Sequence, residues 1–173
     1  MDWGNFLFGF DGRINRAKAW LWILISIIVY AVFGFGILKM VFGVSLITIM
    51  MEIGTRPADI LTTPQIPLAA FCVFYVLMIF IGCAVATKRL HDRNKGAIWL
   101  IPFILLPLVL NLGGAILMPP DMSSGVPAPN PVKIVLSLIS FALSLWAFVE
   151  LYCLRGTEGE NPYGPDPLAR KPH

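Results

Sequence analysis

Three polar clusters interrupt an otherwise apolar chain and contain most of the residues that could do chemistry. Each cluster places arginine or lysine close to carboxylates or amides, so the chemistry that they suggest is ion pairing and the binding of an anion such as a phosphate. In the third cluster, glycines and prolines predict a series of turns, and we expect this segment to dock on the rest of the chain. The clusters are FDGRINRAKAW (10–20), KRLHDRNKG (88–96) and RGTEGENPYGPDP (155–167).

The clusters together predict one charged site. Arg13 and Arg16 are three residues apart, so on a helix they would share one face beside phosphate head groups. If a helix continues into the second cluster, Arg89 and Asp92 can pair with each other. The carboxylates expected to pair with the arginines are Asp11, Asp92, Glu160 and Asp166. The predicted site consists of Arg13, Arg16, Arg89, His91, Asp92, Arg93, Glu160, Asn161, Tyr163 and Asp166. Its surplus positive charge would bind an anionic lipid head group or a segment of a partner.

The second cluster also allows a catalytic interpretation, which the sequence disfavours. His91 and Asp92 are neighbours and would point about 100° apart on a helix, so they do not form a catalytic pair with each other. No serine or cysteine nucleophile lies beside them. The enzymatic alternative is a membrane enzyme acting on lipid phosphates, with His91 as the base and the arginines binding the phosphate.

The cysteines and histidines predict no metal and no cofactor. Cys72, Cys83 and Cys153 all fall in apolar stretches without a CxxC pair, as expected of small apolar fillers. His91 and His173 are too far apart in sequence for a zinc motif, and no glycine cluster matches a phosphate-binding loop.

Apolar stretches must position these clusters. The chain has 173 residues, of which 57% are hydrophobic and only 13% are charged, about half the charged fraction of an ordinary soluble domain. About 20 mainly apolar residues cross a bilayer, and in lipid an open chain must satisfy its backbone hydrogen bonds as a helix. The predicted fold class is therefore an all-α polytopic membrane protein, a bundle of four transmembrane helices. The predicted spans are 20–38, 66–87, 97–117 and 134–154, and the shorter apolar stretch 40–53 either extends the first helix or lies on the membrane surface.

The distribution of positive charge predicts the orientation. Of the 13 lysines and arginines, only Lys39, Arg56 and Lys133 lie on one side of a four-span arrangement. By the positive-inside rule, both termini are expected in the cytoplasm. The net charge of +3 thus describes topology, and we expect no nucleic-acid partner.

Polar residues inside the spans allow another functional alternative. Glu150 and Asn111 could act as polar stations in a small transporter or channel subunit. Pro102 and Pro107 remove backbone donors from the third span and should bend it.

The segments FDGRINRAKAW, KRLHDRNKGA and GTEGENPYGPDP resemble the three signature motifs of the DUF805 family of bacterial inner-membrane proteins. The resemblance covers nearly the whole chain and implies one membrane domain (1–167), with a short basic tail after it (168–173), in the bacterial inner membrane. It implies no known reaction, so we predict a non-enzymatic membrane protein. The expected partners are the lipid bilayer, with an anionic phospholipid as the candidate ligand, and a membrane-protein partner or a second copy of the chain.

Overall fold

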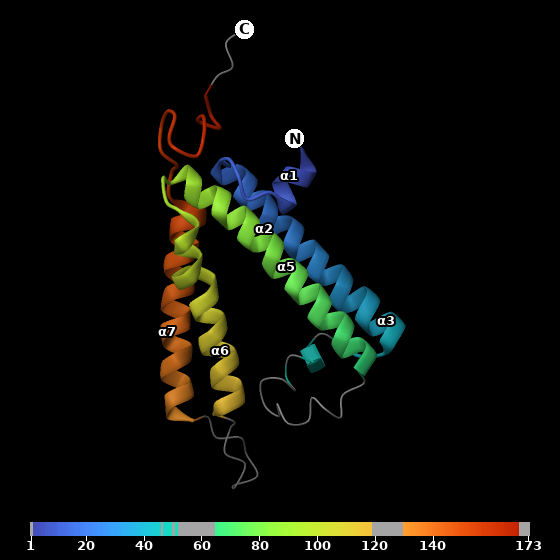
Figure 1. Cartoon of the computed structure of the whole chain (residues 1–173). Coiled ribbons are helices and arrows are strands. Elements are labelled where there is room, and N and C mark those ends of the chain that lie inside the picture. Colours follow the sequence, from blue (N-terminus) through green and yellow to red (C-terminus); the bar gives the residue numbers. More distant parts are fainter. Residues whose placement is uncertain (1, 46, 50, 52–64, 119–129, 170–173) are drawn as a thin grey trace.

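The computed structural model describes residues 2–45, 47–49, 51, 65–118 and 130–169 (Figure 1). Every named element in these ranges is a helix, and four helices are long and apolar enough to cross a membrane. This confirms the predicted all-α polytopic fold class. The four helices extend over Arg16–Phe42, Pro67–Asp92, Ala97–Leu117 and Pro131–Cys153.

Most of these spans combine more than one type of helical turn. A short helix, α1 (Trp3–Phe8), precedes them. The first span consists of α2 (Arg16–Ala31), the π-helical η1 (Val32–Leu38) and α3 (Lys39–Phe42). The second is α5 (Gln65–Asp92), which continues into the second polar cluster. The third consists of the 3-10 turn η3 (Ala97–Trp99), the π-helical η4 (Ile101–Leu105) and α6 (Leu106–Leu117). The fourth consists of α7 (Pro131–Phe148) and the π-helical η5 (Val149–Cys153).

Local chemistry sets the ends of the first span. The side chain of Asn15 accepts a hydrogen bond from the backbone N–H of Lys18 at 3.0 Å and so caps the start of α2. Gly43 adopts a left-handed conformation (φ +70°) and ends α3. The stretch 40–53 therefore extends the first helix only as far as Phe42. Residues 46, 50, 52 and 53 of that stretch, like residues 54–64 and 119–129, lie outside the described residues.

The third span contains two prolines in different surroundings. Pro102 lies in the π-helical turn η4. The carbonyl oxygen of Pro107 accepts hydrogen bonds from Asn111 Nδ2 at 2.8 Å and from Ser140 Oγ at 3.4 Å. The side-chain amide of Asn111 is thus hydrogen-bonded within its own helix, which weakens its interpretation as part of a transport pathway.

The four spans form two pairs (Figure 1). The first pair consists of α2 and α5, and the second of α6 and α7; the pairs meet at the end that carries both termini and diverge toward the other end. Trp22, Ile81 and Val85 form part of the core of the first pair, and Leu90, Phe103 and Leu151 form part of the core where the pairs meet.

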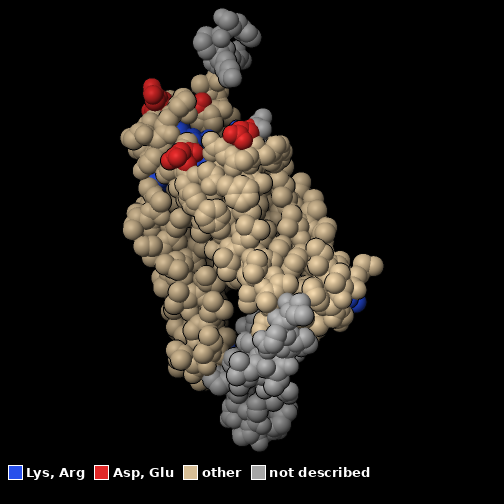
Figure 2. All heavy atoms as spheres, turned by 45° about the vertical axis from the view of Figure 1, so that its right-hand side comes forward, with Lys and Arg blue, Asp and Glu red and all other residues tan. Residues whose placement is uncertain are grey.

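The charged side chains gather where the two pairs meet. We call this end, which includes α1, the turn 93–96 and residues 154–169, the polar end. Figure 2 shows acidic and basic side chains there, above a body that carries one visible cation near its other end. Large apolar side chains on the outside of the spans, such as Leu24, Ile27 and Val73, are exposed, as lipid-facing residues are.

Candidate functional site

A buried ion-pair cluster lies at the centre of the polar end. Asp92, the last residue of α5, accepts hydrogen bonds through Oδ1 from Arg13 Nε at 3.2 Å and from Arg13 Nη2 at 3.1 Å. Its other oxygen, Oδ2, pairs with Arg89 Nη1. The side chains of Arg13, Arg89 and Asp92 are 1%, 0% and 4% exposed. We call these three residues the latch. A buried charge is tolerated only when it is paired and hydrogen-bonded, and the latch meets both conditions.

The latch holds the C-terminal segment, residues 154–169, which we call the strap. Arg13 donates to three carbonyl oxygens of the strap: from Nη1 to Gly159 at 2.7 Å and Gly164 at 3.1 Å, and from Nη2 to Thr157 at 2.6 Å. In return, the backbone N–H and the hydroxyl of Thr157 donate to the carbonyl of Asp92 at 2.7 and 3.0 Å. One arginine near the N-terminus therefore joins the second cluster to the third.

Gly156 permits the close approach of the strap to the latch. A Cβ atom at this position would lie 2.8 Å from Asp92 Oδ1, and closer still to Asp92 Oδ2. Real Cβ atoms do not approach other atoms this closely, and the carboxylate is fixed by two arginines. The strap can therefore pass here only with glycine.

The strap folds on itself through its polar residues. Asn161 and Gly164 exchange backbone hydrogen bonds, and Asn161 Nδ2 donates to the carbonyl of His91 at 2.9 Å. Asp166 accepts hydrogen bonds from the backbone N–H groups of Leu168 at 2.8 Å and Gly159 at 3.1 Å. These two hydrogen bonds, that from Leu168 first, hold the pKa of the Asp166 carboxyl below its ordinary value.

His91 has structural partners on its ring edge and on its ring face. Its Nδ1 lies 3.1 Å from the carbonyl oxygen of Gly12, which can only accept, so Nδ1 is the donor. The ring stacks on Tyr163 of the strap with centroids 3.9 Å apart and planes within 6°. This arrangement gives His91 a packing role, and with Nδ1 as the donor the lone pair of the neutral ring is on Nε2.

Side chains of the first two clusters also cap the end of the fourth span. Arg89 donates from Nε to the carbonyl of Leu151 at 2.7 Å and from Nη2 to the carbonyl of Leu154. Arg16 Nη1 donates to the carbonyl oxygen of Cys153 at 3.0 Å, and Trp20 Nε1 donates to the carbonyl oxygen of Tyr152 at 3.2 Å. The last carbonyls of a helix have no partner within the helix and carry partial negative charge, so cationic donors stabilise them.

Glu150 has two cationic partners from the turn after α5. Its Oε1 lies 3.1 Å from Arg93 Nη2 and 2.5 Å from Lys95 Nζ. Arg93 Nη1 also donates to the carbonyl of Arg155 at 2.6 Å. The carboxylate is therefore neutralised at the polar end, which weakens its interpretation as a station in a transport pathway.

The structure brings most of the predicted site residues together; the expected pairing of Asp92 with arginines is confirmed, and the other expected pairings differ. Asp92 and Glu150 receive the arginines, whereas Asp166 is bonded to backbone N–H groups. In the described part of the chain, Asp11 and Glu160 are exposed and form no ion pair.

Several participants were absent from the predicted site. They are Lys88, Lys95, Glu150, Gly156 and Thr157. Both lysines lie in the second cluster, and Gly156 and Thr157 lie in the third, so cluster membership was the available signal. Which of these residues meet was not visible in the spacing.

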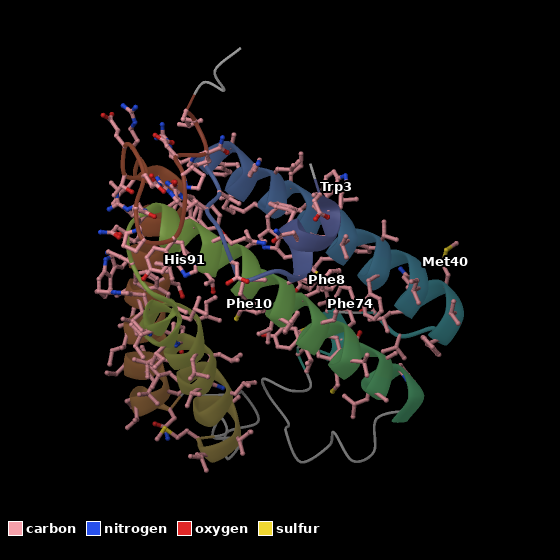
Figure 3. All side chains as sticks on the ribbon, turned by 45° about the horizontal axis from the view of Figure 1, so that its top comes forward. Trp3, Phe8, Phe10, Met40, Phe74 and His91 are labelled. Atoms are coloured by element: carbon pink, nitrogen blue, oxygen red, sulfur yellow. The ribbon has the colours of Figure 1, made fainter. Side chains whose placement is uncertain are left out.

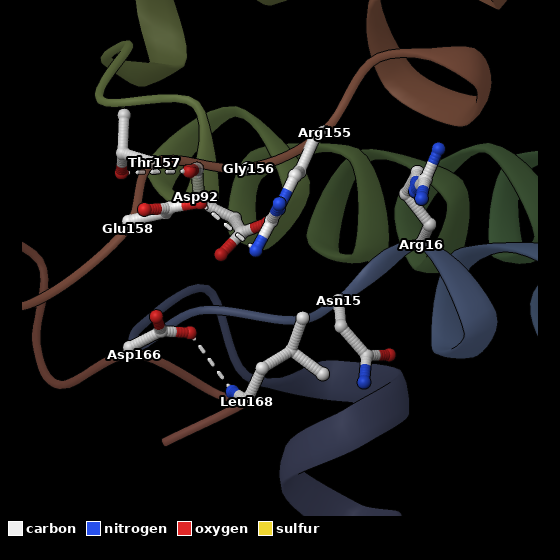
Figure 4. Close-up of a pocket in the computed structure, with 9 residues that line it drawn as sticks. All are labelled: Asn15, Arg16, Asp92, Arg155, Gly156, Thr157, Glu158, Asp166 and Leu168. Carbon is white, nitrogen blue, oxygen red and sulfur yellow. Dashed lines mark hydrogen bonds and ion pairs between the residues drawn. The ribbon is translucent and has the colours of Figure 1, made fainter.

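A cavity of about 220 Å³ lies between the latch and the strap (Figure 4). Asn15 and Arg16 come from the start of α2, and Asp92 comes from the latch. The strap contributes Arg155, Gly156, Thr157, Glu158, Asp166 and Leu168. Among the described residues, no group of three or more histidines, cysteines or carboxylates could hold a metal ion.

Four membrane-length helices joined at one end by buried ion pairs define a polytopic helical membrane protein. The chain belongs to the family described as "Protein of unknown function (DUF805)", whose model matches residues 7–165. The family resemblance seen in the three motifs is thereby confirmed.

Two relatives from Escherichia coli strain K12 match nearly the whole chain. The uncharacterized protein YiiR is 31% identical over 162 residues, which cover 94% of this chain and 88% of YiiR. The inner membrane protein YhaH is 28% identical over 178 residues, which cover 96% of this chain and 97% of YhaH. No solved structure matches the chain. With the four apolar helices, these relatives identify a multi-pass protein of the inner membrane, and they indicate no enzymatic family.

Proposed function

We propose that this protein is a non-enzymatic inner-membrane protein that binds the head group of an anionic phospholipid in the cavity between the latch and the strap. The observation that supports this function is the meeting of Arg16 and Arg155 at one cavity, although they are far apart in the sequence (Figure 4). A phosphate bound between two guanidinium groups would receive charge-assisted hydrogen bonds from both.

The donors needed for a phosphate are available at this cavity. Arg16 is exposed and donates to one carbonyl, that of Cys153, in the described part of the chain. The amide of Asn15 uses its oxygen to cap α2, which leaves its N–H groups for a ligand. Arg155 pairs with Glu158 at 2.9 Å, but the two side chains are 66% and 75% exposed. Such an exposed pair contributes at most about 1 kcal/mol, so a phosphate can replace Glu158.

The other two carboxylates at the cavity differ in their charge balance. Asp92 is paired with the two arginines of the latch, whereas Asp166 accepts two backbone hydrogen bonds and keeps its negative charge. Trp20 lies beside Phe148 and Tyr152 next to Arg16, and aromatic side chains of this kind favour the head-group level of a bilayer. The cavity is therefore suited to a lipid head group rather than to a ligand deep in the membrane.

The bonding of the remaining polar residues favours this proposal over its alternatives. Transport would use Glu150 and Asn111, which are bonded to cations and to a helix carbonyl. Catalysis on lipid phosphates would use His91, whose ring is stacked and hydrogen-bonded. A partner segment at the latch would have to displace the strap, which already occupies it.

Lipid retention in native mass spectrometry tests the proposal on the full-length protein. We expect phosphatidylglycerol to be retained in preference to phosphatidylcholine, and Arg16→Gln or Arg155→Gln to lower that retention about fivefold. This magnitude follows from about 1 kcal/mol for each cation near an anionic surface and 1.4 kcal/mol for each factor of ten. Lys39→Gln is the matched control, because Lys39 is exposed at the other end of the first span. Equal retention in all variants, or no preference for the anionic lipid, would contradict the proposal.

A further inference from the structure

A second cavity, of about 200 Å³, lies between α1, the segment 9–15, the start of α2 and α5. Four charged side chains besides Arg13 line it: Asp2, Asp11, Lys18 and Lys88. The cavity thus contains two carboxylates and two ammonium groups beside the guanidinium of Arg13. These charges suit a ligand that itself carries both signs of charge.

Lys88 is a buried cation without a counter-charge. Its side chain belongs to a residue that is only 2% exposed, and its Nζ donates to the carbonyls of Asn5 at 2.5 Å and Phe6 at 2.7 Å. Among the described residues, no carboxylate forms an ion pair with it, and Nζ otherwise lies over the ring of Phe6, 5.7 Å from the ring centroid. Burying a charge that is not paired is costly, so an anionic group at this cavity would relieve a cost that the protein otherwise bears.

The entrance of the cavity carries both signs of charge. In the described part of the chain, the ammonium group of Lys18 has no hydrogen-bond or ion-pair partner. Asp2 and Asp11 are both exposed, and Asp2 uses one oxygen to accept the backbone N–H of Asn5 at 3.3 Å. A ligand with one phosphate and one ammonium group would complement both pairs of side chains, whereas a purely anionic ligand would leave the two carboxylates unpaired.

Aromatic side chains around α1 place this cavity at the surface of the bilayer. Figure 3 shows Trp3 and Phe8 on α1, beside α5, with Phe10 in the segment that follows. All three side chains are exposed, and Phe10 also packs edge-to-face against Phe80 of α5 with ring centroids 5.4 Å apart. Exposed aromatic rings at the end of a membrane-spanning helix are typical of the head-group layer. At this depth of the bilayer, the available molecule with a phosphate is a phospholipid.

We propose that this cavity binds the head group of a zwitterionic aminophospholipid, with its phosphate at Lys88 and Lys18 and its primary ammonium group at Asp11 and Asp2. A primary ammonium group can donate hydrogen bonds to carboxylates, whereas the quaternary ammonium of phosphatidylcholine has no N–H to donate. The site is separate from the anionic-lipid cavity, so the protein would bind two classes of phospholipid at one end of its helices.

Competition among three lipids in native mass spectrometry of the full-length protein tests this site. We expect phosphatidylethanolamine to be retained about fivefold more than phosphatidylcholine, on the basis of about 1 kcal/mol for a charge-assisted hydrogen bond at a partly exposed site. Asp11→Asn should remove most of this preference, because the preference comes from the ammonium group. Lys18→Gln should instead lower the retention of both lipids, because both carry the phosphate. Both side chains are outside the latch, so these variants should fold, whereas substitution of Lys88 would also remove the hydrogen bonds that hold α1.

Three results would overturn this proposal. The first is equal retention of the ethanolamine and choline lipids. The second is a loss of phosphatidylglycerol, but not of phosphatidylethanolamine, in Lys18→Gln, which would make the cavity a simple anion site. The third is binding of soluble phosphoethanolamine as tight as that of phosphatidylethanolamine, which would mean that the ligand need not be a lipid. Lys39→Gln should leave retention unchanged. Arg16→Gln should lower retention of phosphatidylglycerol alone, so failure of the first site is distinguishable from failure of this one.

Discussion

The latch makes a quantitative prediction for the substitution Asp92→Asn. The change preserves the shape of the side chain and removes the negative charge that faces Arg13 and Arg89, which are 1% and 0% exposed. Removing one partner of a buried ion pair costs about 3–5 kcal/mol, because the other partner is left buried without its counter-charge. With 1.4 kcal/mol for each factor of ten, opening of the strap should become roughly a hundredfold or more frequent.

Hydrogen exchange measured by mass spectrometry on the full-length protein in nanodiscs reports this opening. The backbone N–H groups of Thr157, Asn161 and Gly164 are hydrogen-bonded in the strap, and their exchange should accelerate with its opening. Amides within α7 provide an internal reference for the folding of the helices. A strap that exchanges at the wild-type rate in Asp92→Asn would refute the role assigned to the latch.

Glu160→Gln is the matched control for this experiment. It removes a carboxylate from the strap itself, but Glu160 is exposed and has no ion pair among the described residues. We therefore expect exchange in this variant to equal that of the wild type. Equal acceleration in both variants would mean that the net charge of the strap, and not the buried pairing, holds it in place.

Three further predictions follow from the strap. Gly156→Ala should accelerate exchange of the strap, at a cost of about 1–3 kcal/mol from overpacking against Asp92, whereas Gly113→Ala should not, because no atom lies within 4 Å of the added Cβ; equal effects would contradict this. The pKa of Asp166 is lower in the folded strap than in the unfolded chain, so its stabilisation is complete above the unfolded pKa and is lost as the pH falls through the folded pKa. Exchange at Leu168, corrected for intrinsic pH dependence, should therefore rise on acidification in the wild type and be insensitive in Asp166→Asn. Finally, Glu160→Cys in a chain without its native cysteines should react with a membrane-impermeant maleimide in inverted membrane vesicles and not in intact cells, if the termini are cytoplasmic as the charge distribution predicts.

The sequence predicted the fold class because the fold class depends on a local requirement. Long runs of apolar residues must form helices in lipid, where no water satisfies the backbone, and 66–87 and 134–154 correspond to helices of the structure. The end of the second helix was harder to place. The continuation of α5 to Asp92 depends on the burial of Arg89 and Asp92, which is a property of their distant partners.

The candidate site was predictable in its members more than in its pairings. Arg89 and Asp92 were expected to pair from their spacing on a helix, and they do. The expectation that Glu160 pairs with an arginine was wrong for the described residues, because Glu160 points to solvent while Glu150 receives Arg93. The sequence placed Glu150 inside a span and Glu160 in the third cluster, but it did not show which of them meets an arginine, because that depends on how the helices pack.

The sequence by itself determined that this protein is a helical membrane protein with three polar clusters at the ends of its spans. Apolar length and the type of charged residue are properties of each segment alone. Only the tertiary structure decided that Arg13 binds both Asp92 and the strap, and that Lys88 is buried with carbonyls for partners. The contacts of Arg13 join residues that are 79 to 151 positions apart. Their energies depend on burial, and burial is fixed only when the two pairs of helices meet.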